Sequence, residues 1–124
     1  MGEERKVLIA DDDRILTSLL AARLKARGWK VDVAHDAMQA FMFAQRQKPA
    51  VIVLDVSMPG GSGFDVLRKL GVSVKTSNIP VVVLSSRHTA EDERMASELG
   101  AMAFLDKPVN LELLHETLAG IVGR

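Results

Sequence analysis

Three short apolar runs constrain the fold of this chain more than any other feature of its sequence. They cover residues 7–10, 51–54 and 81–84, they are rich in β-branched side chains, and no polar residue interrupts them. Strands that are buried on both faces have this character, because helices cover both sides of a parallel sheet. We therefore expect these runs to be the central strands of a parallel sheet.

Two further runs have the character of edge strands. Residues 29–33 alternate apolar and polar side chains, so one face of this strand is expected to contact water. Residues 101–105 form a shorter apolar run, which we assign to the opposite edge. Apolar residues recur at helical spacing after each of the five runs, in stripes that include Leu16, Phe41, Leu67, Met95 and Leu114.

The order strand–helix, repeated five times, defines the fold class. Such alternation implies right-handed crossovers, with helices on both faces of one sheet. Three buried strands between two edge strands fit the order 2-1-3-4-5 of flavodoxin-like folds. We predict an α/β fold in which a doubly wound, five-stranded parallel sheet is flanked by five helices. The chain is expected to form one domain over residues 1–124.

Composition excludes several functions. The 16 lysine and arginine residues balance 16 aspartate and glutamate residues, so the chain lacks the positive charge of a nucleic-acid binder. The absence of cysteine excludes disulfides, thiolate zinc sites and cysteine nucleophiles. No apolar run approaches the roughly 18 residues of a spanning helix, and the first residues lack the apolar core of a signal peptide. We expect a cytoplasmic protein that contacts neither nucleic acid nor membrane directly.

Chemically active side chains follow the strands, at the edge of the sheet where such folds bind ligands. They are Asp11, Asp12 and Asp13 after the first strand, Asp55 after the third, Ser85 after the fourth and Lys107 after the fifth. Two carboxylates about 4 Å apart repel by roughly 4 kcal/mol at an effective dielectric of 20, unless a cation offsets them. Oxygen ligands of this kind favour Mg²⁺ or Mn²⁺. We assign Asp13 to the cap of the following helix.

A metal, a carboxylate, a hydroxyl and an ammonium group together indicate phosphoryl transfer. Asp55 is the candidate nucleophile, because it ends a central strand and a carboxylate can attack phosphorus to form an acyl phosphate. Asp11 and Asp12 would then hold the metal, and Lys107 would supply a positive charge. Residues 58–61, Met-Pro-Gly-Gly, are expected to form a flexible loop after Asp55.

Four segments, in this order and spacing, resemble the receiver domains of response regulators, chemotaxis-regulator-like proteins of two-component signalling. They are VLIADDD at 7–13, VLDVSMP at 53–59, VVLS at 82–85 and DKP at 106–108, with Gly63 following the second. The resemblance covers essentially the whole chain, and the set is far more specific than any one segment.

The resemblance implies that Asp55 accepts phosphate from a phosphohistidine of a histidine kinase or a histidine phosphotransfer protein. It implies Mg²⁺, held by Asp11, Asp12, the Asp55 carboxylate and the backbone carbonyl of Ser57, and no organic cofactor. Such a protein is not a classical enzyme, but it catalyses its own phosphorylation and dephosphorylation.

The resemblance also implies a switch. Ser85 would hydrogen-bond the phosphoryl group, Lys107 would pair with it, and Phe104 stands where the family has an aromatic residue that follows the hydroxyl residue. In the family the bond between Lys107 and Pro108 is typically cis. Phosphorylation would bias the surface formed by the fourth helix, fifth strand and fifth helix, which a downstream effector protein or domain would recognise.

Two positions are candidate modulators of the phosphoryl lifetime. Ser57 and Arg87 lie two residues beyond Asp55 and Ser85, and in the family these positions border the phosphoryl group. Arg87 fits a residue that reaches the mouth of the site and alters the access of water, and it fits at least as well an ordinary surface charge that precedes a helix.

Two other functions remain open. The D-x-D of residues 11–13 resembles haloacid-dehalogenase phosphatases, in which Asp11 would be the nucleophile, although the residues that follow and the missing late acidic pair disagree. A degenerate receiver that acts only as a protein-binding module is the other. His35, His88 and His115 lack metal-ligand spacing, and we expect them to lie on the surface.

Overall fold

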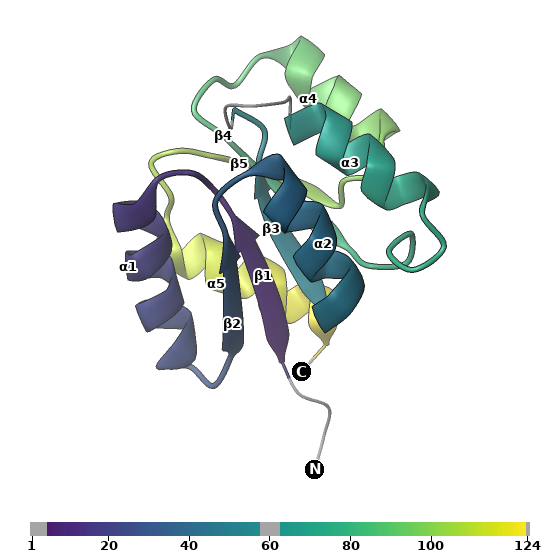
Figure 1. Cartoon of the computed structure of the whole chain (residues 1–124). Coiled ribbons are helices and arrows are strands. Elements are labelled where there is room, and N and C mark those ends of the chain that lie inside the picture. Colours follow the sequence, from purple (N-terminus) through teal and green to yellow (C-terminus); the bar gives the residue numbers. More distant parts are fainter. Residues whose placement is uncertain (1–4, 58–62, 124) are drawn as a thin grey trace.

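The computed structural model describes residues 5–57 and 63–123, in which strands and helices alternate along the chain (Figure 1). The strands are β1 (Lys6–Ala10), β2 (Lys30–Ala34), β3 (Val51–Asp55), β4 (Val81–Ser85) and β5 (Ala103–Asp106). The helices are α1 (Arg14–Lys25), α2 (Ala37–Gln47), α3 (Gly63–Val72), α4 (Ala90–Glu98) and α5 (Leu111–Val122). The loop predicted at residues 58–61 lies outside the described residues.

The strands form one sheet in the order β2-β1-β3-β4-β5, and every pair is parallel. This confirms the predicted fold class. Every residue of β3 and β4 is buried, whereas the edge strands β2 and β5 are largely half-buried or exposed. Both edge strands begin later than the sequence predicts. The N–H groups of Trp29 and Ala101 bond back to Leu24 and Ala96, so these residues close the turns after α1 and α4.

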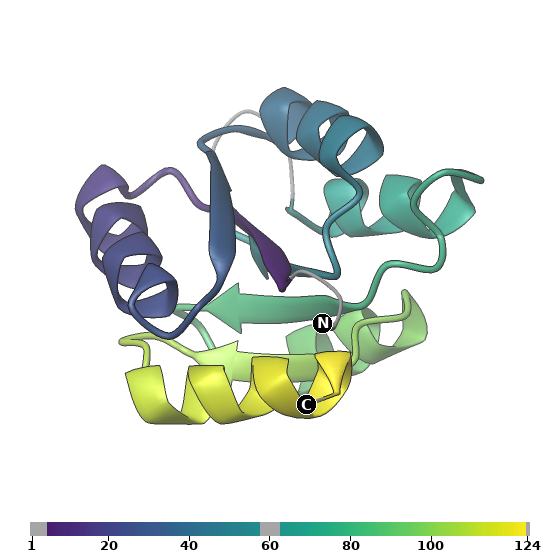
Figure 2. The same cartoon turned by 90° about the horizontal axis from the view of Figure 1, so that it is seen from below.

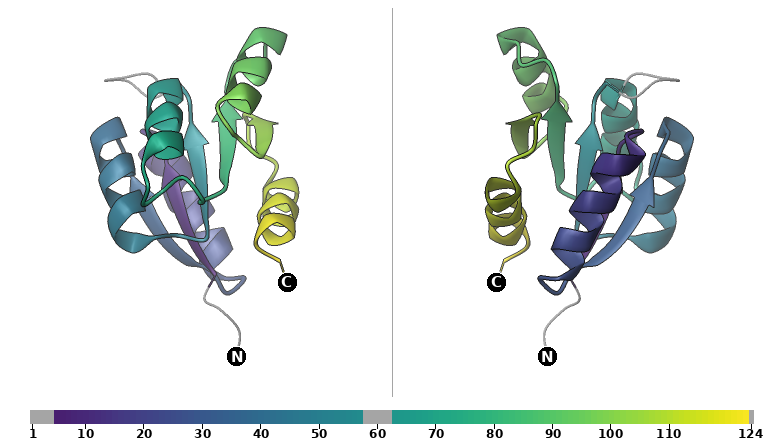
Figure 3. Two further views of the ribbon diagram at one scale, coloured as in Figure 1. Left: turned by 90° about the vertical axis from the view of Figure 1, so that its right-hand side faces the viewer. Right: turned by 90° about the vertical axis from the view of Figure 1, so that its left-hand side faces the viewer.

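The sheet lies between two layers of helices, as the views in Figures 2 and 3 show. Helices α1 and α5 cover one face, and α2, α3 and α4 cover the other. Alternate residues of each central strand enter opposite cores. In β1, Val7 packs with Leu20 and Leu114, whereas Leu8 packs in the cluster that contains Leu67. Among the helices described, none is long and apolar enough to cross a membrane.

Side-chain caps fix where four of the described helices begin, and thus where the loops before them end. Asp13 accepts a hydrogen bond from the Leu16 N–H at 3.0 Å, which confirms its predicted role. Asp36, Thr89 and Asn110 cap α2, α4 and α5 in the same way. Asp11 and Asp12 precede the capped helix and are left at the edge of the sheet.

Candidate metal and phosphoryl site

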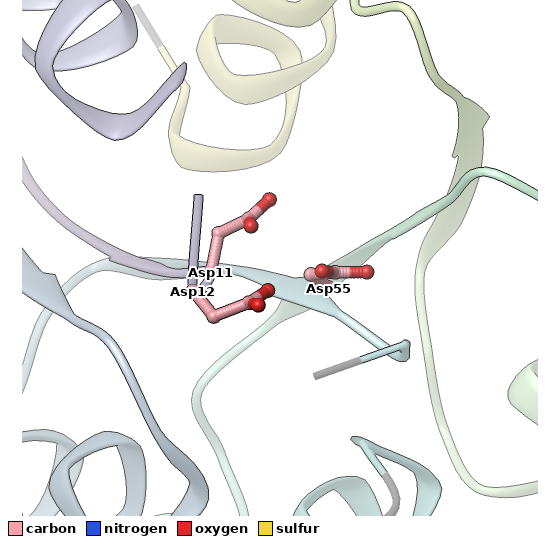
Figure 4. Close-up of side chains that lie close together, drawn as sticks. All are labelled: Asp11, Asp12 and Asp55. Carbon is pink, nitrogen blue, oxygen red and sulfur yellow. The ribbon is translucent and has the colours of Figure 1, made fainter. Parts of the chain in front are cut away.

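Three carboxylates meet at the carboxyl edge of the sheet (Figure 4). Asp11 and Asp12 directly follow β1, and Asp55 ends the neighbouring strand β3. One carboxylate oxygen from each residue lies within 4.8 Å of those from the other two. Adjacent parallel strands end at the same edge, so residues more than 40 positions apart share one site. The structure therefore brings together the three carboxylates that the sequence singled out.

The three carboxylates differ in burial and in hydrogen bonding. Asp11 and Asp55 are buried, whereas Asp12 is exposed. The Asp13 N–H donates to Asp11 Oδ1 at 2.9 Å, and Ser57 donates to Asp55 Oδ1 through both its N–H, at 2.9 Å, and its hydroxyl, at 2.6 Å. Burial raises the pKa of Asp11, the negative charge of Asp55 adds to this effect, and hydrogen bonds from Lys107 and Asp13 only partly oppose it.

Lys107 supplies the positive charge of the site. Its Nζ lies 2.8 Å from Asp11 Oδ2 and donates to Asp55 Oδ2 at 3.3 Å. Burial would lower the pKa of Lys107, but the hydrogen bonds and charges of Asp11 and Asp55 outweigh it and raise the pKa. The Lys107–Pro108 peptide bond is cis, as the resemblance implies.

This donor set suits a hard divalent cation. Three carboxylates face a single ammonium group, so the local charge is negative even with the ion pairs formed. Every candidate ligand atom is oxygen, which matches the preference of Mg²⁺. Asp12 is exposed and leaves one side of the cluster open to solvent.

Ser85 lies beside this cluster, but its hydroxyl is turned toward its own loop. Ser85 is buried, and its Oγ donates to the Arg87 carbonyl at 2.6 Å and accepts from the Arg87 N–H at 3.0 Å. With Ser57, Phe64, Asp92 and neighbouring residues, Ser85 and Arg87 line a cavity of about 260 Å³. The exposed Arg87 guanidinium donates to Asp92 Oδ2 at 3.2 Å.

Gly63 stands where the backbone of α3 approaches the strand end most closely. A Cβ atom on Gly63 would lie 2.3 Å from the Val56 Cα and 2.7 Å from the Asp55 carbonyl oxygen. Only glycine permits this approach without a backbone shift. The Gly63 N–H also bonds to the Val56 carbonyl at 3.3 Å, which ties the start of α3 to the residue after Asp55.

The structure corrects the prediction that all three histidines lie on the surface. His88 is exposed, but His35 and His115 are half-buried. The His35 Nδ1 contacts the Asp11 carbonyl oxygen at 3.0 Å, and the His115 ring packs edge-on to Trp29. The contact of His35 with Asp11 could have been predicted from the strand order, because His35 follows β2 and Asp11 follows the neighbouring strand β1.

Phe104, the expected switch aromatic, has a partner that sequence reasoning missed. Phe104 is half-buried on β5 and packs against the core beneath α4. The His88 ring lies against it, with centroids 5.1 Å apart and planes inclined by 48°. His88 also contacts Glu93 and Asp106.

The structure is a five-stranded flavodoxin-like sheet that carries an acidic cluster with an opposing lysine at its carboxyl edge, the arrangement that the sequence resemblance implies. Residues 7–119 match the response regulator receiver domain family, and the chain belongs to this family. It is therefore a receiver domain of two-component signalling. This membership favours the receiver interpretation over the phosphatase alternative.

Similar proteins include stand-alone and longer regulators. PilH of Pseudomonas aeruginosa is 32% identical over 117 residues, which cover 94% of this chain and 97% of PilH. The probable transcriptional regulatory protein TcrX of Mycobacterium tuberculosis is 34% identical over 123 residues, which cover 99% of this chain and 52% of TcrX. The chain thus spans about half the length of TcrX and of other transcriptional regulators that it matches.

A solved structure of a Burkholderia pseudomallei response regulator superposes with a TM-score of 0.86 and is 26% identical. The match covers 93% of this chain and 66% of that one. The Burkholderia structure is described as containing a phosphorylated aspartic acid, a calcium ion and citrate.

Proposed function

We propose that this chain, as one receiver domain over residues 1–124, is a phosphorylation-dependent switch in a two-component or phosphorelay system. The observation that carries the proposal is the buried Asp55 carboxylate, which adjoins Asp11 and Asp12 and contacts the Lys107 ammonium. Its phosphoryl donor is a histidine kinase or a histidine phosphotransfer protein, and its output is an effector protein or domain. It works in the cytoplasm without direct contact to nucleic acid or membrane.

Asp55 is the phosphoryl acceptor. One of its carboxylate oxygens attacks the phosphorus of the donor phosphohistidine, and the P–N bond breaks with its electron pair returning to the imidazole. Lys107 compensates charge on the phosphoryl oxygens, and Ser57 orients the carboxylate through Oδ1. In dephosphorylation, water attacks the phosphorus, the P–O bond to Asp55 breaks with its electron pair returning to the carboxylate, and inorganic phosphate is released.

Asp11, Asp12 and Asp55 would hold Mg²⁺ or Mn²⁺, with the backbone carbonyl of Ser57 as a further ligand. When bound, the ion offsets the negative charge of the carboxylates and of the phosphoryl oxygens. The excess of carboxylates over ammonium in the cluster supports this assignment. So does the Burkholderia regulator, which shares this fold and whose structure is described as containing a phosphorylated aspartic acid and a calcium ion.

Ser85 and Phe104 are the switch residues of the proposal. To reach a phosphoryl group on Asp55, the Ser85 hydroxyl has to leave the Arg87 carbonyl that it now contacts. Phe104, on the neighbouring strand β5, then follows into the altered space, and the surface of α4, β5 and α5 changes for the effector.

The decisive experiment is labelling by acetyl phosphate or by a phosphorelay donor in the presence of Mg²⁺. The unaltered chain should incorporate phosphate stoichiometrically and Asp55→Asn should incorporate none. Asp13→Asn is the matched control, because asparagine caps a helix as well as aspartate does and the change lies at the same edge. Stoichiometric labelling of Asp55→Asn would contradict the assignment of Asp55 as the acceptor. Label mapped to Asp11 would instead support the phosphatase alternative.

Stability in the presence of Mg²⁺ separates this proposal from a degenerate receiver. Mg²⁺ at about 100 times its dissociation constant should add roughly 2.7 kcal/mol to the free energy of unfolding. If neither Mg²⁺ nor a phosphoryl analogue changes the stability, the chain is a binding module with no phosphoryl chemistry.

A further inference from the structure

We propose that His88 is a proton-operated latch that holds the β4–α4 loop and the Phe104 ring in the unphosphorylated arrangement. His88 lies in the loop of residues 86–89, between β4 and α4. Its Nδ1 is 2.6 Å from Asp106 Oδ1, and its Nε2 is 2.8 Å from Glu93 Oε1. One imidazole therefore joins the loop to β5 on one side and to α4 on the other.

Both contacts can be hydrogen bonds only when His88 is protonated. A neutral imidazole carries one N–H and can donate to one carboxylate, whereas the imidazolium donates from both nitrogens. The hydrogen bond to Glu93 raises the pKa of His88, desolvation opposes it, and the charge of Asp106 and the hydrogen bond to it add to the rise. Below this raised pKa, the protonated His88 donates hydrogen bonds to both carboxylates. As the pH increases through the pKa, His88 loses a proton and with it the hydrogen bond to one of the two carboxylates.

The charges that face the imidazole come from the two elements packed against the loop. They are Glu93 from α4 and Asp106 from β5. The nearest cation in sequence, Arg87, directs its guanidinium to Asp92 rather than to the histidine. Two carboxylates therefore act on His88 together, and both favour its protonated form.

The latch reaches the switch residues through two direct connections. The His88 ring packs against Phe104, so a change in the position or charge of one ring alters the surroundings of the other. The residue before His88, Arg87, is the hydrogen-bond partner of Ser85. Since the Ser85 hydroxyl has to leave Arg87 to reach a phosphoryl group, a loop clamped at His88 opposes that movement.

The first test needs no phosphorylation, and so it does not depend on the proposed function. NMR titration of the full chain should show the His88 and Phe104 ring resonances changing with one midpoint, above that of an ordinary histidine. His88→Gln should remove the Phe104 transition, and Asp106→Asn should move its midpoint to lower pH. His115→Gln, which alters a histidine that packs on Trp29 instead, should leave the transition unchanged. The latch would be overturned if the Phe104 ring resonances did not change with pH, or if they still changed with pH in His88→Gln.

The second test rests on the proposed function, because it measures the binding of beryllofluoride, a phosphoryl analogue, with Mg²⁺ at about pH 6 and about pH 8. Beryllofluoride should bind more tightly at the higher pH, and the ratio of the two affinities should be roughly two- to fivefold larger than in His88→Gln. Equal ratios would contradict the latch. If the unaltered chain binds no beryllofluoride at either pH, the proposed function fails, and the titration of Phe104 still decides on the latch.

Discussion

Asp106, the last residue of β5, and Lys107, the residue after it, direct their side chains into two charge clusters that differ in burial. The inner cluster consists of Asp11, Asp55 and Lys107, whose side chains are 0%, 2% and 17% exposed. The outer cluster consists of His88, Glu93 and Asp106, whose side chains are 43%, 54% and 60% exposed. Contact distances in the two are similar, with Lys107 2.8 Å from Asp11 and His88 2.6 Å from Asp106.

The difference in burial decides what each cluster can do. Inside the protein, charges interact strongly and a missing partner is costly, because water cannot replace it. At the surface, water and salt screen the same contacts, so an ion pair contributes little to stability. We therefore expect the inner cluster to govern stability and phosphoryl chemistry, whereas the outer cluster sets small conformational preferences.

Removal of the inner cation should give the largest change in stability. Lys107→Met keeps an unbranched side chain of similar length but leaves two buried carboxylates facing each other. At pH 7 without divalent cation, the free energy of unfolding should fall by about 3 kcal/mol. Urea denaturation measures the free energy of unfolding. Added Mg²⁺ should reduce the difference between Lys107→Met and the unaltered chain, because the ion restores positive charge beside the two carboxylates.

Lys75→Met is the control for Lys107→Met, because Lys75 is exposed and outside both clusters. It should change the free energy of unfolding by no more than about 0.5 kcal/mol. If Lys107→Met is as stable as the unaltered chain, the inner cluster does not depend on its lysine, and the contrast between the clusters fails.

The inner cluster was predictable from sequence, because it depends only on strand order. The apolar runs that end before Asp11 and before Asp55 are buried on both faces, which places them inside the sheet, and the order 2-1-3-4-5 makes them neighbours. Once the order is known, the carboxyl ends of the parallel strands are known to lie at one edge of the sheet. Lys107, which follows β5, is therefore expected at the same edge as Asp11 and Asp55. Hydrophobic periodicity therefore carries the fold and the position of these charges together.

The outer cluster was not predictable, because it depends on side-chain directions in a loop. His88 lies 18 residues before Asp106, and nothing in the pattern of apolar residues indicates that their side chains meet. The Ser85 hydroxyl is similar, since its bond to Arg87 is a local choice of rotamer that strand order leaves undetermined. Such contacts follow from tertiary packing, after the fold has been set.

Asp11→Asn tests the cost of a buried negative charge. Burial first, and the charge of Asp55 second, raise the pKa of Asp11, so the folded state binds a proton more tightly than the unfolded state does. Asp11 therefore destabilises the fold at neutral pH, and this cost disappears as the pH falls through its folded pKa. Asp11→Asn should raise the free energy of unfolding by about 1–2 kcal/mol at pH 7, and the gain should shrink in acid.

Urea denaturation of Asp11→Asn across a series of pH values, with and without Mg²⁺, measures the effect. The variant should lose most of the stabilisation by Mg²⁺, whereas Asp13→Asn should retain both this response and the ordinary pH dependence. A variant that is less stable than the unaltered chain at pH 7 would show that attraction to Lys107 outweighs the burial of Asp11.

The smallest change in stability is expected for Arg87→Ala, at the exposed side of the site. The pair of Arg87 with Asp92 is exposed at the guanidinium, so its loss should leave the free energy of unfolding nearly unchanged. Arg87 also lines the cavity beside Ser57 and Ser85. In the proposed function, this cavity is the route by which water would reach a phosphoryl group on Asp55. We therefore expect phosphate release to be faster by roughly two- to fivefold, which corresponds to less than about 1 kcal/mol of barrier.

Phosphate release after acetyl phosphate labelling, measured together with urea denaturation, tests Arg87→Ala on both counts. Arg68→Ala is the control, because it removes another exposed arginine from an ion pair, the one with Asp65 on α3. An unchanged rate of phosphate release would show that Arg87 is an ordinary surface charge with no effect on the lifetime of the phosphoryl group. A faster rate at unchanged stability would separate the two sides of the site in energetic terms, because exposed charges would then tune the lifetime of a state whose existence depends on the buried ones.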